Sequence, residues 1–261
     1  MAKTEPVTIA NLDEHNRLAF ERFLKFEHEM KASSKELNPS YRAPYQNLNP
    51  TPLGLCAFAL TTFMASMYLA GATVLVTASL GVVMGPALCY GGLVQLLAGL
   101  LEFRNGNSLL GLIFSSYGGF WLSFASLNIS AFSFLSGYSD SVALNNALGV
   151  FFLAWTIYTV LMLLAVLRTN FVTIGLFVFL IICFVLLTAS KFLQADPNLQ
   201  RAAGAFGIHY RKFLQADPNL QRAAGAFGIL TAAIAWYSAI AHLLNSMDWF
   251  FKLPLFEVKW W

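Results

Sequence analysis

The chain has 261 residues, of which 57% are hydrophobic and 11% are charged, with a net charge of +3 and a mean hydropathy of +0.62. Soluble domains carry roughly 25% charged residues, so this composition excludes an ordinary soluble protein. The small net charge, with no basic patch interleaved with aromatic residues, also argues against a nucleic-acid partner.

Residues 1–48 form a polar N-terminal tail that contains most of the acidic residues. Hydrophobic residues recur there at helical spacing between about 10 and 36, which predicts a short amphipathic helix. Such a helix can lie on the membrane surface or against another subunit, or it can be a loosely held cytosolic helix. The periodicity does not distinguish between these alternatives.

A run from Pro44 to Leu101 contains no Asp, Glu, Lys or Arg. A helix needs about 20 apolar residues to cross a bilayer, so this run is long enough for two crossings. Apolar segments of nearly that length or longer fall at about 52–70, 82–101, 108–134, 146–167, 171–190 and 226–246. The sequence therefore predicts an all-α bundle of six transmembrane helices over residues 49–246, followed by a C-terminal tail at 247–261.

Six crossings place both termini on one side of the membrane. Arg104 and Arg168 would then lie on the same side as the N-terminal tail. Because positive residues concentrate in cytoplasmic loops, this favours cytoplasmic N- and C-termini. We expect a multi-pass protein of the plasma membrane, in direct contact with the lipid bilayer.

A duplication interrupts the chain at 191–229. Residues 191–208 read KFLQADPNLQRAAGAFGI, and residues 212–229 repeat them without a change. Such identity indicates either a recent in-frame duplication or an artefact of the sequence. The second copy leads directly into the last apolar segment, so we expect the first copy to be an additional loop, and we assign it no chemistry.

The sequence shows none of the residue arrangements that are typical of catalytic or metal-binding sites. The cysteines Cys56, Cys89 and Cys183 form no C-x-x-C or Cys/His arrangement, so we expect no metal and no cofactor. We find no nucleophile–base pair and no phosphate loop, which argues against an enzyme. The first five segments carry ionisable residues only at their boundaries, which argues against a cation pump or antiporter.

Neutral polar and aromatic side chains remain as candidates to line a pathway. Their hydroxyl, amide and indole groups can hold a small anion or a neutral acid without a fixed charge. Each also has an ordinary structural role, as a backbone partner, an interfacial anchor or a bridge between helices. These pore-lining candidates are Thr61, Thr62, Tyr90, Gln95, Asn107 and Trp121.

Residues 49–55 read N-P-T-P-L-G-L and form a distinctive motif at the start of the first apolar segment. The motif is similar to the N-P-A-P-L-G-L signature of the acetate uptake transporter family of bacteria, archaea and fungi, with Thr51 in place of the usual Ala or Gly. The resemblance continues in YGGLVQLLAG at 90–99, in SSYGGFWLSF at 115–124, and in GAFG with AWY at 225–237. The other signature positions are Asn49, Pro50, Pro52, Leu53, Gly54 and Leu55.

The resemblance implies a six-span protomer that assembles into a hexamer, each protomer with its own pore for acetate and similar short carboxylates. It also implies a central constriction of a Phe, a Tyr and a Leu, which the family motifs place at Phe58, Tyr117 and Leu180. Bulky apolar groups narrow and dry a pore, while a phenol offers a hydrogen bond to a passing carboxylate.

We therefore expect a transporter or channel for acetate or acetic acid and related short-chain carboxylates, with transport linked to a proton. Two other classes of function stay open. One is a channel for another small solute such as ammonia, and the other is a non-transporting membrane sensor or scaffold that acts through the 1–48 tail.

Overall fold

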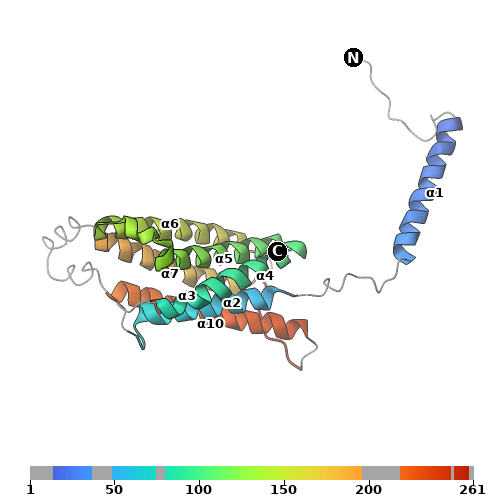
Figure 1. The fold of residues 1–261 in the computed structure, drawn as a ribbon. Coiled ribbons are helices and arrows are strands. Elements are labelled where there is room, and N and C mark those ends of the chain that lie inside the picture. The colour runs from blue at the N-terminus through green and yellow to red at the C-terminus, as the bar shows by residue number, and fades with distance from the viewer. Residues whose placement is uncertain (1–13, 37–48, 75–79, 196–217, 248–249, 259–261) are drawn as a thin grey trace, which may run out of the picture. The chain divides into compact units, whose positions relative to one another are not determined.

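The computed structural model describes residues 14–36, 49–74, 80–195, 218–247 and 250–258. These residues form helices and one isolated antiparallel bridge (Figure 1). The chain divides into two units, Met1–Leu48 and Asn49–Trp261. The second unit contains every membrane-spanning candidate among the described residues.

The first unit contains a single described helix, α1 (Glu14–Glu36), close to the range that the periodicity predicts. Arg17 and Glu21, one turn apart, form an ion pair at 3.9 Å on its surface. Leu18, Phe23 and Phe26 are exposed within this unit. The helix thus carries apolar side chains that no described residue of its own unit covers.

Six helices of the second unit are long and apolar enough to cross a membrane. This confirms the predicted number of spanning helices and an integral multi-pass architecture. The helices are α2 (Thr51–Ala70), the composite α3–η2–α4 (Gly81–Arg104), α5 (Ser108–Asn128), α6 (Ser141–Val166), α7 (Phe171–Ala195) and α10 (Pro218–Ser246).

The second crossing is a composite of three pieces, where the sequence predicts one continuous helix. α3 (Gly81–Leu88) passes into a π-helical stretch, η2 (Cys89–Val94), and then into α4 (Gln95–Arg104). A π-helical turn adds a residue to the helix and is frequent at functional sites. Gly91 in this stretch lies against Thr61 of α2, where a Cβ atom would be 2.5 Å from Oγ1.

The third crossing is shorter than the apolar segment 108–134 suggests, because α5 ends at Asn128. Two 3₁₀ turns, η3 (Ser130–Phe132) and η4 (Phe134–Gly137), lead from it toward α6. Asp140 begins α6 by accepting hydrogen bonds from the backbone N–H groups of Val142 and Ala143, both at 3.1 Å. The polar break before α6 is thus a capped helix start.

The helices pack in a chain of neighbours (Figure 1). α2 lies along α10, α10 along α7, and α7 along α6, while α4 lies along α5. Gly225 of α10 faces α2 so closely that a Cβ atom there would be 2.6 Å from the carbonyl oxygen of Ser66. Small residues allow such approach where lipid gives helices no hydrophobic drive to associate.

The duplicated segment contributes to two helices. The second copy enters α10 from Pro218, and Gly225 and Gly228 in it pack against α2. The first five residues of the first copy, 191–195, are not a loop as predicted but the end of α7. Phe192 among them lies against Gly149 of α6. The rest of the first copy lies outside the described residues.

Apolar side chains cover the outside of the bundle. Val82, Val150, Leu164 and Phe171 are each 60% exposed or more. Such exposure would be costly in water and is ordinary in hydrocarbon. The outer face therefore matches a lipid environment.

The C-terminal tail pairs with the turn between α6 and α7. The N–H of Phe171 donates to the carbonyl of Phe256 at 3.0 Å, and the N–H of Val258 donates to the carbonyl of Thr169 at 3.1 Å. These bonds form the isolated antiparallel bridge, which joins Asn170 to Glu257. The tail is thereby held at the end of the bundle where α7 begins.

Candidate functional site

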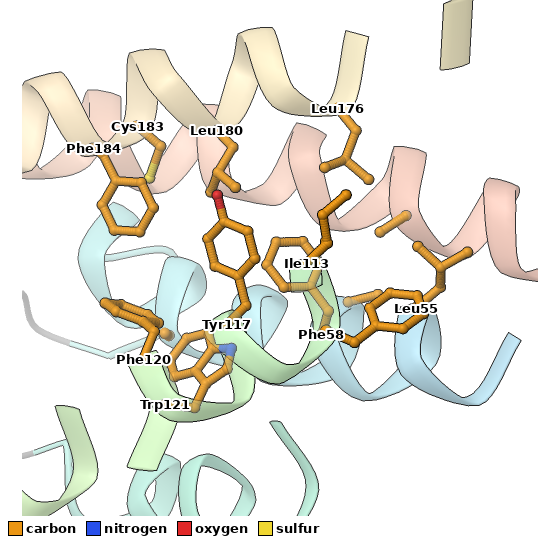
Figure 2. Packing of buried hydrophobic residues seen from close by; sticks show 14 of the residues in the cluster. Leu55, Phe58, Ile113, Tyr117, Phe120, Trp121, Leu176, Leu180, Cys183 and Phe184 are labelled. Carbon is orange, nitrogen blue, oxygen red and sulfur yellow. The ribbon is translucent and has the colours of Figure 1, made fainter. Parts of the chain in front are cut away.

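Phe58, Tyr117 and Leu180 meet inside the bundle, from α2, α5 and α7 respectively (Figure 2). All three are buried. The rings of Phe58 and Tyr117 lie edge to face, with centroids 5.8 Å apart and planes at 64°. Aromatic rings prefer this geometry, which adds to the stability of the contact.

These three residues form a wall between two cavities. In each of their helices, the residues that precede them line a smaller cavity of about 40 Å³. The residues that follow them line a larger cavity of about 260 Å³. Two hollows thus lie along the bundle in series, separated by Phe58, Tyr117 and Leu180.

The larger cavity is mostly apolar, with several aromatic rings and a few polar groups. Thr62 and Trp121 contribute to its lining, and the hydroxyl of Thr62 and the indole N–H of Trp121 are buried without a hydrogen-bond partner among the described residues. Lys191 and Gln221 also contribute to its lining. Buried polar groups without a partner are costly unless water or a ligand satisfies them. Thr62 and Trp121 thus bring unpaired polar groups close to a cavity with largely apolar walls.

The smaller cavity is bordered by polar side chains from four helices. It is lined by Thr51 of α2, Gln95 of α4, Thr173 of α7, and Ser238 and His242 of α10. Gln95 is only 1% exposed, and its Oε1 has no partner in the part of the chain that the structure describes. Thr51 donates a hydrogen bond from its hydroxyl to Oε1 of Glu102, at the end of α4.

The phenol of Tyr117 is already engaged within the bundle. Its hydroxyl donates to Oγ1 of Thr159 on α6 at 2.9 Å, and Thr159 donates in turn to the carbonyl of Trp155 at 2.6 Å. The phenolic proton is thus directed to Thr159, whereas the sequence-based expectation directs it to a passing carboxylate. The aromatic ring remains part of the wall.

The start of the signature segment shapes the first turn of α2. Oδ1 of Asn49 accepts from the N–H of Thr51 at 3.2 Å. Pro50 is the N-cap residue, and Pro52 lies in the first turn, where a missing N–H costs no helical hydrogen bond. These residues determine where the helix begins, beside the smaller cavity.

The rest of the signature segment packs on both sides of α2. Gly54 lies under the ring of Phe114, and a Cβ atom there would be 2.6 Å from its Cδ2. Leu55 is buried and lines the smaller cavity, while Leu53 is exposed. Gly54 therefore allows α2 and α5 to approach closely.

The polar candidates separate into two groups. Thr61 bonds the carbonyl of Ala57 at 2.9 Å, and Asn107 caps α5 by accepting from the N–H of Leu110 at 3.2 Å. Neither of them lines the two cavities, and neither does Tyr90. The candidates that do line a cavity are Thr62, Gln95 and Trp121.

Glu102 and His242 are polar residues of this region that the sequence motifs do not indicate. Glu102 lies at the boundary of its apolar segment, yet it is only 3% exposed. Glu102 follows Gln95 by seven residues, two helical turns, and His242 follows Ser238 by four. These spacings place each pair on one face of its helix, a signal that points to a shared polar surface.

A sequence model of the GPR1/FUN34/yaaH family matches this chain in two segments, residues 33–212 and 209–260. The first segment contains the first duplicated copy and the second contains the second copy. The second matched segment thus begins just before the second copy. This is expected if the chain carries one additional copy of a segment that other family members have once.

Named relatives and a solved structure are similar to the chain. "Meiotically up-regulated gene 86 protein" of Schizosaccharomyces pombe is 36% identical over 234 residues, 87% of this chain and 69% of the relative. "Acetate permease A" of Emericella nidulans is 38% identical over 223 residues, 81% of this chain and 67% of the relative. "Ammonia transport outward protein 2" of Saccharomyces cerevisiae is 35% identical over 215 residues, with shares of 81% and 68%.

The fold also has a solved counterpart. The bacterial acetate channel SatP superposes with a TM-score of 0.60 at 27% identity, over 76% of this chain and 93% of SatP. The agreement extends over most of both proteins. On the family match, the identities and this fold, the chain belongs to the GPR1/FUN34/yaaH family, the acetate transporter family that its motifs resemble.

Proposed function

We propose that this protein lets acetate and related short-chain carboxylates cross a membrane along the two cavities, with Phe58, Tyr117 and Leu180 as the constriction. The observation that carries the proposal is that these three residues line both cavities. The names of an acetate permease and an acetate channel among similar proteins support the choice of substrate.

The wall residues carry no formal charge, and this bears on the form in which an acid passes. Moving an ionised carboxylate into an apolar constriction is far more costly than moving the neutral acid. We therefore propose passage linked to a proton, with the acid protonated before the wall and ionised after it. Labelled acetate uptake into proteoliposomes should rise when the donor side is made more acidic, and an uptake rate independent of pH would contradict the linkage.

Substitution of the wall residues Phe58 and Tyr117 tests whether acetate passes between the two cavities. Phe58→Ala and Tyr117→Ala should each widen the constriction and increase the uptake of longer monocarboxylates relative to acetate. Val150→Ala is a matched control, because Val150 is 60% exposed on α6 and lines neither cavity. All variants are compared at equal surface expression. Unchanged rate and selectivity in both wall variants would refute the assignment.

We further propose a hexamer in the plasma membrane, with both termini in the cytoplasm. The apolar outer face supports contact with lipid or with other copies of the chain. Native mass spectrometry of the detergent-solubilised protein measures the number of subunits. A monomer under conditions that keep the protein active would contradict the hexamer.

Ammonia is a second candidate substrate, because relatives are named ammonia transport outward proteins. Neutral ammonia is small and carries no charge, so it can pass a constriction whose side chains are uncharged. A pH-sensitive dye inside the same proteoliposomes reports ammonia entry within one preparation. Ammonia flux without acetate flux would favour this function over carboxylate transport.

A further inference from the structure

Glu102 is a buried carboxyl group whose presence the wall between the cavities does not explain. It lies near the end of α4 and is only 3% exposed, whereas the residues that follow it, 103–106, are exposed. Its Oε1 accepts a hydrogen bond from the hydroxyl of Thr51, and the side chain of Asn107 also bonds the carboxyl group. Hydrogen bonds thus hold a buried acid close to an exposed turn.

The helices packed on α4 bring no cation to balance a charge on Glu102. These elements are α2, η2 and α5, and none of the three contains Asp, Glu, Lys, Arg or His. Arg104 on α4 itself is exposed and lies two residues away, a spacing at which helical side chains do not face each other. The titratable side chains of the packed elements are thiols and phenols, which are neutral at physiological pH: Cys56, Tyr68, Cys89, Tyr90 and Tyr117.

Burial therefore makes the ionised form of Glu102 costly, and a bound proton removes that cost. An ionised carboxyl that is taken out of water needs a cation or several donors, and the neutral form needs neither. The hydrogen bonds from Thr51 and Asn107 stabilise the ionised form in part. A carboxyl in such a place is suited to bind a proton and to release it again.

Thr51 connects this carboxyl to the solute pathway. Its hydroxyl bonds Glu102, and the residue also lines the smaller cavity. A hydroxyl can accept a proton on its oxygen while it releases its own, so it can pass a proton from one side to the other. α7 and α10 contribute Thr173 and His242 to the same cavity, and His242 is a further titratable group there.

We propose that Glu102 is the proton-binding residue of acid transport, and that it exchanges its proton with the solute through the hydroxyl of Thr51. The inference rests on the proposed carboxylate transport. Neutral Glu102 gives its proton to the oxygen of Thr51, while Thr51 releases its own proton to a carboxylate in the smaller cavity. Glu102 is then ionised, Thr51 is again a hydroxyl, and the solute is a neutral acid that can pass the wall.

The observed hydrogen bond agrees with the end of this exchange. The hydroxyl of Thr51 donates to Oε1 of Glu102, which is the arrangement expected once Glu102 has lost its proton. Water at the exposed turn after Glu102 supplies the next proton. A solute that moves in the opposite direction reverses the steps, and Glu102 then takes the proton from the neutral acid.

The pH dependence of acetate uptake by proteoliposomes tests this proton site. If the protein cannot protonate the solute, uptake follows the neutral acid in solution and falls about tenfold for each pH unit above the pKa of acetic acid. If Glu102 protonates it, uptake falls less steeply, because acetate itself becomes a substrate. Molecules with Glu102 toward the outside dominate uptake at high pH, so a preparation of mixed orientation is suitable. The flux into protein-free liposomes is subtracted.

Glu102→Gln keeps the size of the side chain and an acceptor for Thr51, but it cannot release a proton. It should convert the shallow pH dependence into a fall of about tenfold for each pH unit. Thr51→Val removes the hydroxyl and should give the same steep fall, whereas Thr51→Ser should retain the shallow dependence. Glu257→Gln is the matched control, because Glu257 is an exposed carboxyl in the C-terminal tail. Size-exclusion chromatography shows that each variant is folded.

The outcomes separate this inference from the proposed function. If the unaltered protein carries no acetate, both are overturned. If it carries acetate and its uptake already falls about tenfold for each pH unit, or if Glu102→Gln retains the shallow dependence, only the proton site is overturned. A Glu102→Gln variant that is slower by one factor at every pH also overturns the site, because that pattern indicates a purely structural role. If Glu102→Gln does not fold, Thr51→Val decides, and a shallow dependence in that variant overturns the exchange through Thr51.

Discussion

Thr51 and Glu102 form a buried polar contact at the start of the first membrane helix. Both are at most 5% exposed, and the hydroxyl of Thr51 donates to the carboxyl of Glu102. The backbone carbonyl of Glu102 also accepts from the N–H of Asn107 at 2.9 Å. A carboxyl removed from water needs such partners. The Thr in the signature segment is therefore a partner of Glu102 and not only a helix-starting residue.

Thr51→Val should destabilise the protein, because it leaves the buried Glu102 carboxyl without this donor. The expected loss is about 1 kcal/mol of unfolding free energy, the net contribution of one hydrogen bond, because the side chain of Asn107 still bonds the carboxyl. Thr51→Ser keeps the hydroxyl and is the control. Thermal unfolding in detergent measures both variants. A Val variant as stable as the unaltered protein would show that the contact contributes nothing.

Tyr117→Phe separates the two roles of this side chain. It removes the hydrogen bond to Thr159 and keeps the ring that lies against Phe58. We expect a stability loss of about 1 kcal/mol and acetate selectivity close to that of the unaltered protein. Selectivity measured by competition with longer acids checks this. If Tyr117→Phe loses selectivity as strongly as Tyr117→Ala, the phenol takes part in recognition and the ring alone is insufficient.

At the scale of elements, the contact between α2 and α10 depends on small residues. A Cβ atom at Gly225 would meet the backbone of α2, at Ser66 and Ala70. Backbone cannot move aside as a flexible side chain can. The helices can therefore lie this close only because position 225 has no side chain.

Gly225→Ala should destabilise the bundle by about 1–3 kcal/mol, because the added methyl group overpacks the contact. Gly119→Ala in α5 is a matched control with the opposite expectation. A Cβ atom at Gly119 meets nothing within 4 Å, and alanine is the better helix former. Thermal unfolding compares the two variants. Equal effects at both positions would contradict the close approach of α2 and α10.

The apolar runs are sufficient to predict six helices, because the length and hydropathy needed to cross a bilayer can be read from consecutive residues. The π-helical stretch Cys89–Val94 was not predictable, since its hydrophobicity is continuous with that of its neighbours. The meeting of Phe58 with Tyr117 came from family motifs alone. The bonds from Thr51 to Glu102 and from Tyr117 to Thr159 join residues 51 and 42 positions apart, and no local pattern encodes such distances.

At the scale of the whole molecule, the duplication leaves the described bundle intact. The first copy completes α7 and the second begins α10. Because the copies are identical, removing residues 196–216 leaves one unbroken copy between the two helices. The sequences that form the end of α7 and the start of α10 are the same before and after this deletion.

The deletion of 196–216 should give a folded protein that carries acetate at least as fast as the full chain. The deletion leaves only Asp217 between Ala195 and Pro218, so the adjoining ends of α7 and α10 must unwind to form the connection. It removes none of the packed residues described above. Size-exclusion chromatography and uptake at matched expression check this result. A deletion that unfolds the protein or stops uptake would mean that the additional copy is needed for the fold or for transport.

The hydrogen bonds between the C-terminal tail and the α6–α7 turn allow the orientation of the protein in the membrane to be measured. Val258 is held to Thr169, and Trp261 follows only three residues later, a reach of about 10 Å at most. A label fused after Trp261 must therefore lie on the same side of the bilayer as Arg168. One accessibility measurement on such a label, in sealed cells, would orient the ends of all six helices together.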